Sequence, residues 1–599
     1  MIAHKHITKI IAVVMAVAVC LCLCAVAFSG QITAAMGNTG VSMEYETKLF
    51  DTGSVLTVNI LMDEADWNDM LANAAAEEYY QCDVEIGGKT FYRVAIRPKG
   101  NTSLTSIASD PTTDRYSFKL EFDHYVDGQT CFGLDKLILN NNYADATNMK
   151  EALIYDMYQY LGADASLYNY AKISVNGEYW GVYLALEAVE DSFLLRNYGM
   201  QSGALYKPDS MNIGGGKEFG GDFNAGDMDF GGMTPPDTAP EAGQQPPDGG
   251  PGDNFGFKGG GGGFSANGGA DLNYTDDELD SYETIWDGAV TDATKADHKR
   301  VVTALKNISE GNDLEDYMDI DNLLRYMAVH VFSVNEDSLS GSMAHNYYLY
   351  ESGGKLNLIP WDYNLSFGGM GGGKDAASVV NSAIDDAFSI TDFFDTLMAD
   401  ETCHSQYYAY LQQLVREYLD DGGFDAFYER VRGQIDALVE TDPTAFYSYD
   451  EYRTAADTLY QVVKLRGASI QGQLDGTILS TESTQRGSDA LVDASALDLS
   501  VMGSMNTGGG EQPRGADFSQ PDGESREPAD DPQQLAEAAP DRGDGSFGGR
   551  PSMDGFPGSS GSTSPAASPN PLLLYGISAL AITAAMLFAL LYRRRPGNR

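Results

Sequence analysis

The chain has 599 residues, 43% of them hydrophobic, which is enough for one large domain or roughly two to three ordinary ones with appendages. Its 38 basic residues stand against 87 acidic ones, so the net charge at pH 7 is -49. Nucleic-acid binding requires clustered Lys and Arg to neutralise phosphates, so this balance argues against a nucleic-acid partner and favours a soluble, self-repelling exterior.

The amino-terminal residues 1–27 predict a secretory signal peptide. Lys5 and Lys9 precede an apolar run, and Ala25 and Ala27 have the small-residue spacing of a cleavage site. An uncleaved anchor is the alternative interpretation. The cysteines that remain after cleavage are too few and too scattered for a disulfide framework or a zinc site: Cys82, Cys131 and Cys403.

The next part of the chain is predicted to be rich in strands. Residues 56–96 alternate between apolar and polar side chains around one short helix, and Asn176-Gly177 joins two further strands by the strongest short hairpin signal. Between them lie two strand-like runs and a helix with a polar start and a terminal glycine: Arg115–Asp123, Asp135–Asn141 and Thr147–Gly162.

Residues 208–270 are dominated by Gly and Pro. Such a segment cannot bury enough apolar surface to offset its ordering entropy, so it is predicted to be a disordered insertion. Helical periodicity dominates after it, in these segments: Ala296–Ser309, Ile320–Ser333, Ile390–Ala399, Ser405–Leu419, Phe424–Glu440 and Ser448–Leu474. The order of the elements predicts an α+β fold, with a sheet-rich half followed by a helical half.

The carboxyl-terminal part predicts a stalk and a membrane anchor. Residues 476–570 are polar and rich in Pro and Gly, which is typical of a low-complexity stalk. Residues 571–592 form an uncharged apolar segment, predicted to be a transmembrane helix because it is long enough to cross a hydrocarbon core of ~30 Å. Arginines in the tail, residues 593–599, mark its cytoplasmic side. We therefore expect a single-pass protein of the cell membrane whose folded domain is extracytoplasmic.

Three polar residues in the helical half predict a site for phosphoryl transfer. Asp337 and Asn346 lie in the loop between an apolar helix and a hairpin, and Asp362 ends the second strand of that hairpin. Phosphoryl transfer needs one carboxylate near the attacking hydroxyl, and an amide plus a second carboxylate to hold the metal that bridges the phosphates. A helix-end residue is the ordinary alternative for Asp337, and a turn residue for Asn346. Asp362 favours a cation or a basic partner, because burying an unpaired carboxylate beside Trp361 is costly.

Basic residues in the strand-rich half are candidates for binding phosphates. Arg97, Lys99 and Ser103 belong to a predicted cationic, flexible loop, for which an exposed polar loop is the alternative. Alternation puts Lys119 on the strand face opposite its apolar neighbours, where it would face solvent or line a cleft. Glu151, in the first turn of the following helix, is a candidate partner of Lys119, with an ordinary first-turn acid as the alternative.

Several segments together resemble the spore coat protein H (CotH) kinase-like family. They occur in order over most of residues 55–370, and they are "RPKGNTS", "YSFKLEF", "LILNNNYADATNMKEALIYDMYQYLG", "VNGEYWGVYLALEAVEDSFL", "NEDS", "HNYYLY" and "IPWDYNLSFG". The resemblance implies an atypical protein-kinase-like bilobal fold over residues 43–475, with a sheet-rich N-lobe and a helical C-lobe. It also implies transfer of the ATP γ-phosphate to Ser or Thr hydroxyls of surface or coat proteins, with Mg²⁺ or Mn²⁺ as cofactor.

The same resemblance implies roles for single residues. Asp337 corresponds to the catalytic-loop Asp, Asp362 to the metal-binding Asp and Asn346 to the catalytic-loop Asn. Lys119 resembles the strand lysine that grips phosphate, and the backbone of Glu187–Val189 resembles the hinge that binds adenine. A non-catalytic surface protein for coat assembly or adhesion is the alternative, and a polysaccharide-modifying or polysaccharide-binding protein is a third. Asp337 and Asp362 together favour the kinase, since a binding scaffold has no physical need for both.

Overall fold

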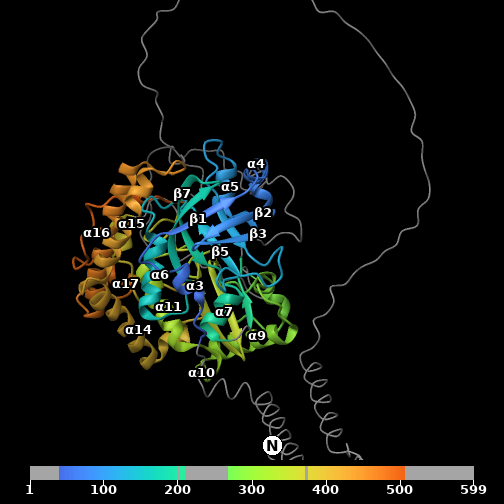
Figure 1. The fold of residues 1–599 in the computed structure, drawn as a ribbon. Helices are drawn as coiled ribbons and strands as arrows, with labels where there is room; N and C mark the ends of the chain where they lie inside the picture. Colours follow the sequence, from blue (N-terminus) through green and yellow to red (C-terminus); the bar gives the residue numbers. More distant parts are fainter. Residues whose placement is uncertain (1–39, 200–202, 210–267, 371–374, 506–599) are drawn as a thin grey trace, which may run out of the picture. The chain divides into compact units, whose positions relative to one another are not determined.

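Seven strands in the first half of the chain close into a barrel, in the order β1-β2-β3-β4-β5-β7-β6 (Figure 1). The computed structural model describes residues 40–199, 203–209, 268–370 and 375–505. β1 pairs with β2 in antiparallel and with β6 in parallel orientation, and the parallel pairing closes the ring. The strands are β1 (Leu56–Leu61), β2 (Tyr80–Ile86), β3 (Lys89–Lys99), β4 (Ser117–Glu121), β5 (Lys136–Asn140), β6 (Tyr168–Val175) and β7 (Glu178–Glu187).

Apolar side chains that alternate along the strands fill the barrel interior. In β4, Phe118 and Leu120 are fully buried in this core, whereas Lys119 between them is partly exposed on the outer face. The ring of Trp67 packs 5.4 Å from the ring of Phe118. The outer face of β3, β4 and β5 is therefore free to carry polar residues. The predicted hairpin turn also forms, and Asn176 and Gly177 both have positive φ angles, of 51° and 87°.

A second sheet of three strands belongs to the helical half, in the order β10-β9-β8. It consists of β8 (Ala204–Tyr206), β9 (Tyr347–Ser352) and β10 (Lys355–Pro360). β9 and β10 form the hairpin that the sequence predicts, with Leu349 opposite Leu358. Gly353 and Gly354 of its turn have φ angles of 64° and 96°, which favour glycine because it lacks Cβ. β8, which comes before residues 210–267 in the sequence, thus pairs with β9, which comes after them.

Helices cover the two sheets. α6 (Lys150–Leu161) and α11 (Ile320–Ser333) pack against one another near the centre of Figure 1, and α11 also contacts β10 and α14. The remaining α-helices are α3 (Glu44–Lys48), α4 (Glu64–Ala72), α5 (Thr102–Ala108), α7 (Asp191–Tyr198), α8 (Glu283–Asp287), α9 (Lys295–Glu310), α10 (Leu314–Tyr317), α12 (Ala376–Val380), α13 (Asp395–Ala399), α14 (Glu401–Gln413), α15 (Gly423–Glu440), α16 (Tyr449–Leu474) and α17 (Glu482–Gln485). The other helical elements are η1 (Ala74–Ala76), η3 (Leu279–Tyr282), η4 (Leu414–Asp420), which is a π-helix, and η5 (Leu499–Met502).

The predicted bilobal, protein-kinase-like fold is wrong. The described residues belong to one compact unit, and its strands are divided between a closed barrel and a separate three-stranded sheet among the helices. Closure depends on pairs such as Val58 with Ile173, which are far apart in the sequence. Local periodicity predicts that each of these segments is a strand but gives no information about its partner.

The ends of the predicted domain also change. The stalk was expected to begin at residue 476, but α17 and η5 lie beyond that point, and Leu499 and Met502 are buried in the main core. At the far end of the Gly-rich insertion Ala270 is buried as well, while residues 210–267 lie outside the described part.

The predicted signal peptide (1–27), transmembrane helix (571–592) and cytoplasmic tail (593–599) lie outside the described residues too. Among the helices that the structure does describe, none combines the length and apolar character needed to cross a bilayer. Cys82, Cys131 and Cys403 are free thiols.

Candidate active site

The outer face of the barrel carries basic side chains from β3 and β4. Arg97 lies opposite Lys119 across the two strands, and alternation puts Lys99 on the same face. Arg97 forms an ion pair with Glu77, and Lys119 Nζ lies 2.9 Å from Glu190 Oε1. Burial alone would raise the pKa of Glu190, but the neighbouring lysine charges outweigh burial and lower it. Two of these three cations are thus already neutralised within the protein.

Glu151 of α6 lies on the side of Lys99. Lys99 Nζ donates to Asn140 Oδ1 at 3.1 Å, and Asn140 Nδ2 donates to Glu151 Oε2 at 2.8 Å. The expected pairing of Glu151 with Lys119 is therefore wrong. Glu151 Oε1 is buried without a hydrogen-bond partner in the described part of the chain. Burial and the nearby Asp362 raise the pKa of Glu151 to about 8, so this carboxyl is mostly protonated at neutral pH unless a cation binds it.

Asp362 follows β10 in a left-handed backbone conformation, with a φ of 60° that is uncommon for a residue other than glycine. Asn335 Nδ2 holds its backbone carbonyl at 3.3 Å. Among the described residues no hydrogen bond reaches its carboxylate. Burial and the charge of Asp337 raise the pKa of Asp362, while Lys99 and Lys207 oppose the increase. A buried carboxylate with a raised pKa and an uncommon backbone conformation is typical of functional sites.

The loop between α11 and β9 brings Asp337 and Asn346 together. Asn346 Nδ2 donates to the backbone carbonyl and to Oδ2 of Asp337, both at 3.0 Å. His345 Nε2 lies 2.8 Å from Asp337 Oδ1. Asp337 also acts electrostatically on Asp362, so the loop and the end of β10 meet in one polar region. All three residues that the sequence predicts for phosphoryl transfer lie in this region.

Four predicted cofactor-binding residues are placed differently from the prediction. Arg97 and Lys99 end β3 instead of forming a loop, and Ser103 lies in the short helix α5, where no described hydrogen bond links it to the carboxylates. Glu187 is fully buried, and its carboxylate accepts hydrogen bonds from Tyr45 and Arg196 in a structural cluster. The backbone amide of Glu187 donates to the carbonyl of Leu167 at 2.9 Å and that of Ala188 to the carbonyl of Lys136 at 3.4 Å, so both amides are already engaged.

Lys207 is a site residue that the sequence did not predict. It follows β8, and its Nζ lies 5.7 Å from the centre of the Trp361 ring, the same distance as the Nζ of Lys99. Burial and repulsion from Lys99 lower the pKa of Lys207 to about 8. No local signal marks this lysine, because its neighbours come from β3 and from the end of β10. Only its position at the border of the Gly-rich segment sets it apart in the sequence.

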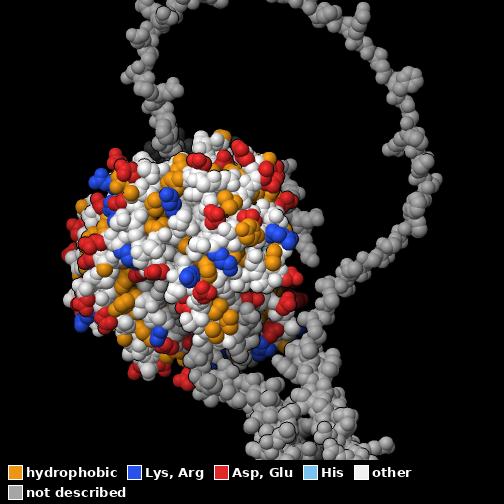
Figure 2. Space-filling view, viewed as in Figure 1, with side chains coloured by type: hydrophobic (Ala, Val, Ile, Leu, Met, Phe, Trp, Pro, Cys, Tyr) orange, Lys and Arg blue, Asp and Glu red, His pale blue; other side chains and the backbone are white. Residues whose placement is uncertain are grey.

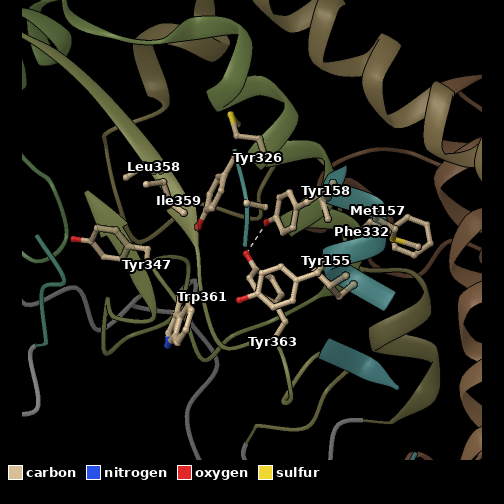
Figure 3. Close-up of a cluster of buried hydrophobic side chains, with 14 of the residues drawn as sticks. Tyr155, Met157, Tyr158, Tyr326, Phe332, Tyr347, Leu358, Ile359, Trp361 and Tyr363 are labelled. Carbon is tan, nitrogen blue, oxygen red and sulfur yellow. Dashed lines mark hydrogen bonds between the residues drawn. The ribbon is translucent and has the colours of Figure 1, made fainter. Parts of the chain in front are cut away.

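A buried group of aromatic side chains holds the end of β10 in place (Figure 3). Figure 3 shows the hydroxyls of Tyr158 and Tyr363 pointing toward one another, 2.7 Å apart. His330 of α11 bonds Tyr363 through Nδ1 at 3.0 Å and Ser340 through Nε2 at 2.7 Å. The residue after Asp362 and the loop of Asp337 are thus anchored to the same histidine.

The carboxylates fit a hard divalent cation in donor type. Across the described ranges, no group of three or more His, Cys, Asp or Glu side chains is arranged to hold a metal by itself. Mg²⁺ is commonly bound by only one or two carboxylates together with substrate phosphates, so such a group is not required. The unpartnered Glu151 Oε1 and the carboxylate of Asp362 supply oxygen donors of the kind that Mg²⁺ and Mn²⁺ prefer.

The face shown in Figure 2 carries many acidic side chains. Figure 2 shows Asp and Glu side chains spread over the visible face, while Lys and Arg occur in separate small groups. An extended basic surface of the kind that nucleic acids require is absent from this face.

Comparison with known proteins gives two findings. A family model described as CotH kinase protein matches residues 96–470. The inner spore coat protein H of Bacillus subtilis (strain 168) is 24% identical over 361 residues, which cover 58% of this chain and 80% of that protein. The matched range of the family model contains all the candidate site residues described above except Glu77.

Proposed function

The chain belongs to the CotH kinase protein family, and from this premise we propose that it is a membrane-anchored, extracytoplasmic kinase that transfers the γ-phosphate of ATP to Ser or Thr hydroxyls of surface or coat proteins. The observation that carries the proposal is the convergence of Asp337, Asp362 and Glu151 beside Lys99 at the outer face of the barrel. The proposal rests on this site and on the family, and not on a kinase-like fold.

Each residue of the site has a task that phosphoryl transfer requires. Asp337, oriented by Asn346 and His345, accepts the proton of the acceptor hydroxyl. Asp362, with Asn346 and Glu151, would hold Mg²⁺ or Mn²⁺, which when bound neutralises charge on the phosphates. Lys99 is the cation best placed to bind the phosphates, because Arg97 and Lys119 are occupied by glutamates.

The location follows from the sequence and from the relative. Segment 571–592 would anchor the chain, and the folded residues would lie outside the cytoplasm. The relative in Bacillus subtilis is described as an inner spore coat protein, which supports a coat or surface location for this chain as well.

A non-catalytic role in coat assembly or adhesion is the second candidate. It is favoured by the ion pairs that occupy Arg97 and Lys119 and by the structural use of Glu187, which leave fewer groups for ATP than expected.

Phosphate transfer distinguishes the two candidates. The full chain in detergent is incubated with γ-labelled ATP, Mg²⁺ or Mn²⁺ and Ser-rich acceptor peptides, and labelling of the chain and of the peptides is counted. Asp337→Asn and Asp362→Asn are each expected to lower the rate by about 100-fold or more. Asp450→Asn is the matched control, because the Asp450 side chain is 95% exposed and remote from the site in sequence. Equal labelling by all four proteins would refute the site.

Binding gives a second, independent readout. ATP with Mg²⁺ at about 100 times its dissociation constant should stabilise the wild-type chain by about 2.7 kcal/mol, and the increase in Tm should vanish in Asp362→Asn.

A further inference from the structure

We propose that Lys207 and Lys99 together form a binding site for a chain of two or more phosphates, located at the ring of Trp361. The inference deepens the proposed function and rests on it, because it names the group that would hold the phosphates of the donor nucleotide. Lys207 comes from the segment after β8 and Lys99 from the barrel, so the site joins the two halves of the described chain.

The position of Lys207 is fixed by its backbone. Its amide donates to the carbonyl of Gly288 at 2.7 Å. A Cβ atom on Gly288 would lie 2.2 Å from the Lys207 carbonyl oxygen, so only glycine permits this close approach. The backbone from which the Lys207 side chain extends toward Trp361 is therefore held in place by Gly288.

Both lysines lie against the same aromatic surface. The Nζ of Lys207 lies 5.8 Å from the ring centre of Tyr348 and 5.7 Å from that of Trp361, and the Nζ of Lys99 lies 5.7 Å from the latter. Tyr348 and Trp361 pack edge to face, with ring centres 5.5 Å apart. Lys99 also acts electrostatically on Lys207, so a chain of phosphates beside Trp361 can contact both ammonium groups.

Neither ammonium group has an ion pair with any described residue, unlike Arg97 and Lys119 on the same face. The acidic residues that act on Lys207 are Asp362 and Asp209, while Lys99 and Lys119 repel it. Cations that are desolvated close together are costly in the free protein, and an anion that contacts both relieves this cost.

Two separate ammonium groups beside Trp361 favour a guest with several negative charges. Asp362 is the carboxylate that acts on both lysines, but it forms no ion pair with either of them. Lysines bind phosphates as compact point charges without a demand for planar geometry, so a flexible phosphate chain suits the pair.

Binding of inorganic tripolyphosphate tests the inference without requiring transfer. The full-length chain is titrated by calorimetry in EDTA at low salt, with Lys207→Met, Lys207→Arg and the control Lys355→Met, an exposed lysine of β10. Lys207→Met should weaken binding at least tenfold, equivalent to about 1.4 kcal/mol. Lys207→Arg should remain within about threefold of the wild type and Lys355→Met should be unchanged.

Any of three results would overturn the inference: that the wild type fails to bind tripolyphosphate, that Lys207→Met binds it as tightly as the wild type, or that orthophosphate binds as tightly as tripolyphosphate. If Lys207→Met does not fold, amine modification of the wild type replaces it. Tripolyphosphate should then protect Lys207 from acetylation, as measured by mass spectrometry, and unchanged acetylation would refute the site.

Failure of the inference is distinguishable from failure of the proposed function. If the wild type transfers phosphate but Lys207→Met binds tripolyphosphate normally, the kinase activity is supported and the role of Lys207 is refuted. If Lys207→Met loses binding while the wild type transfers no phosphate, the phosphate-binding site is supported and the kinase activity is refuted.

Discussion

Replacing His330 by Gln should flatten the acid dependence of stability. His330 is 1% exposed on α11, bonded to Tyr363 and Ser340, and packed beside the ring of Tyr326. Burial lowers its pKa from 6.5 to about 3. The unfolded chain therefore binds a proton at this histidine below pH 6.5, whereas the folded chain does not until about pH 3. The free energy of unfolding consequently falls as the pH drops through this window.

The two pKa values set the magnitude. Between pH 7 and pH 5 the difference in proton binding removes about 2 kcal/mol from the free energy of unfolding, and the maximum loss near pH 3 is about 5 kcal/mol. Other titrating groups contribute to the same pH dependence, so the comparison between wild type and variant isolates this histidine. His330→Gln should be less stable at pH 7, because hydrogen bonds are lost, but its further loss on going to pH 5 should be about 2 kcal/mol smaller.

Urea unfolding at pH 7 and pH 5, followed by circular dichroism, measures both numbers. Tyr363→Phe is the matched control, since it removes the partner of Nδ1 at 3.0 Å but keeps the buried imidazole. It should lose about 1 kcal/mol at both pH values and retain the wild-type difference between them. If His330→Gln shows the same difference between pH 7 and pH 5 as the wild type, burial does not control the protonation of this histidine.

The other predictions concern stability. Arg115 and Asp442 form a buried ion pair, with side chains 2% and 1% exposed. Arg115→Met should lower the free energy of unfolding in urea by about 3–5 kcal/mol, because it leaves the carboxylate buried and unpaired, and a loss below about 1 kcal/mol would contradict this. Gly503 has a φ of 79°, and a Cβ there would lie 2.6 Å from the Ala144 carbonyl oxygen, so Gly503→Ala should cost about 1–3 kcal/mol and speed amide exchange near residue 146. Asp362→Asn should stabilise the metal-free chain by roughly 1 kcal/mol and so raise its Tm, because it removes a desolvated carboxylate. A lower Tm in calorimetry would show that the neighbouring charges fully offset the burial of this carboxylate.

The sequence determined the local elements well where the signals are short-range. Helix α11 spans Ile320–Ser333 as predicted, because Asp319 caps it and its apolar residues recur at helical spacing. The Asn176-Gly177 turn and the β9–β10 hairpin follow from the same kind of local chemistry. The sequence also predicts a costly burial of the Asp362 carboxylate at the end of β10, and burial does raise the pKa of this group.

Residue partners were less accessible to sequence reasoning. Alternation gave the correct face of Lys119, but a face can meet many neighbours, and the neighbour is Glu190 instead of Glu151. The resemblance predicts that the backbone of Glu187–Val189 binds adenine, whereas the Glu187 amide donates to the carbonyl of Leu167 and its carboxylate lies in a buried cluster with Arg196. Lys207 had no signal at all, because its pKa and its contacts depend on residues from distant strands.

By itself, the sequence determined the strands, the helices, the acidic surface and the family, since propensity, periodicity and motifs reside in neighbouring residues. Only the tertiary structure decided that the strands close into a barrel and that Lys99, Lys207, Glu151 and Asp362 meet. The physical reason is that burial, charge coupling and parallel strand pairing join residues that are remote along the chain, and their strength depends on distances that no local pattern encodes.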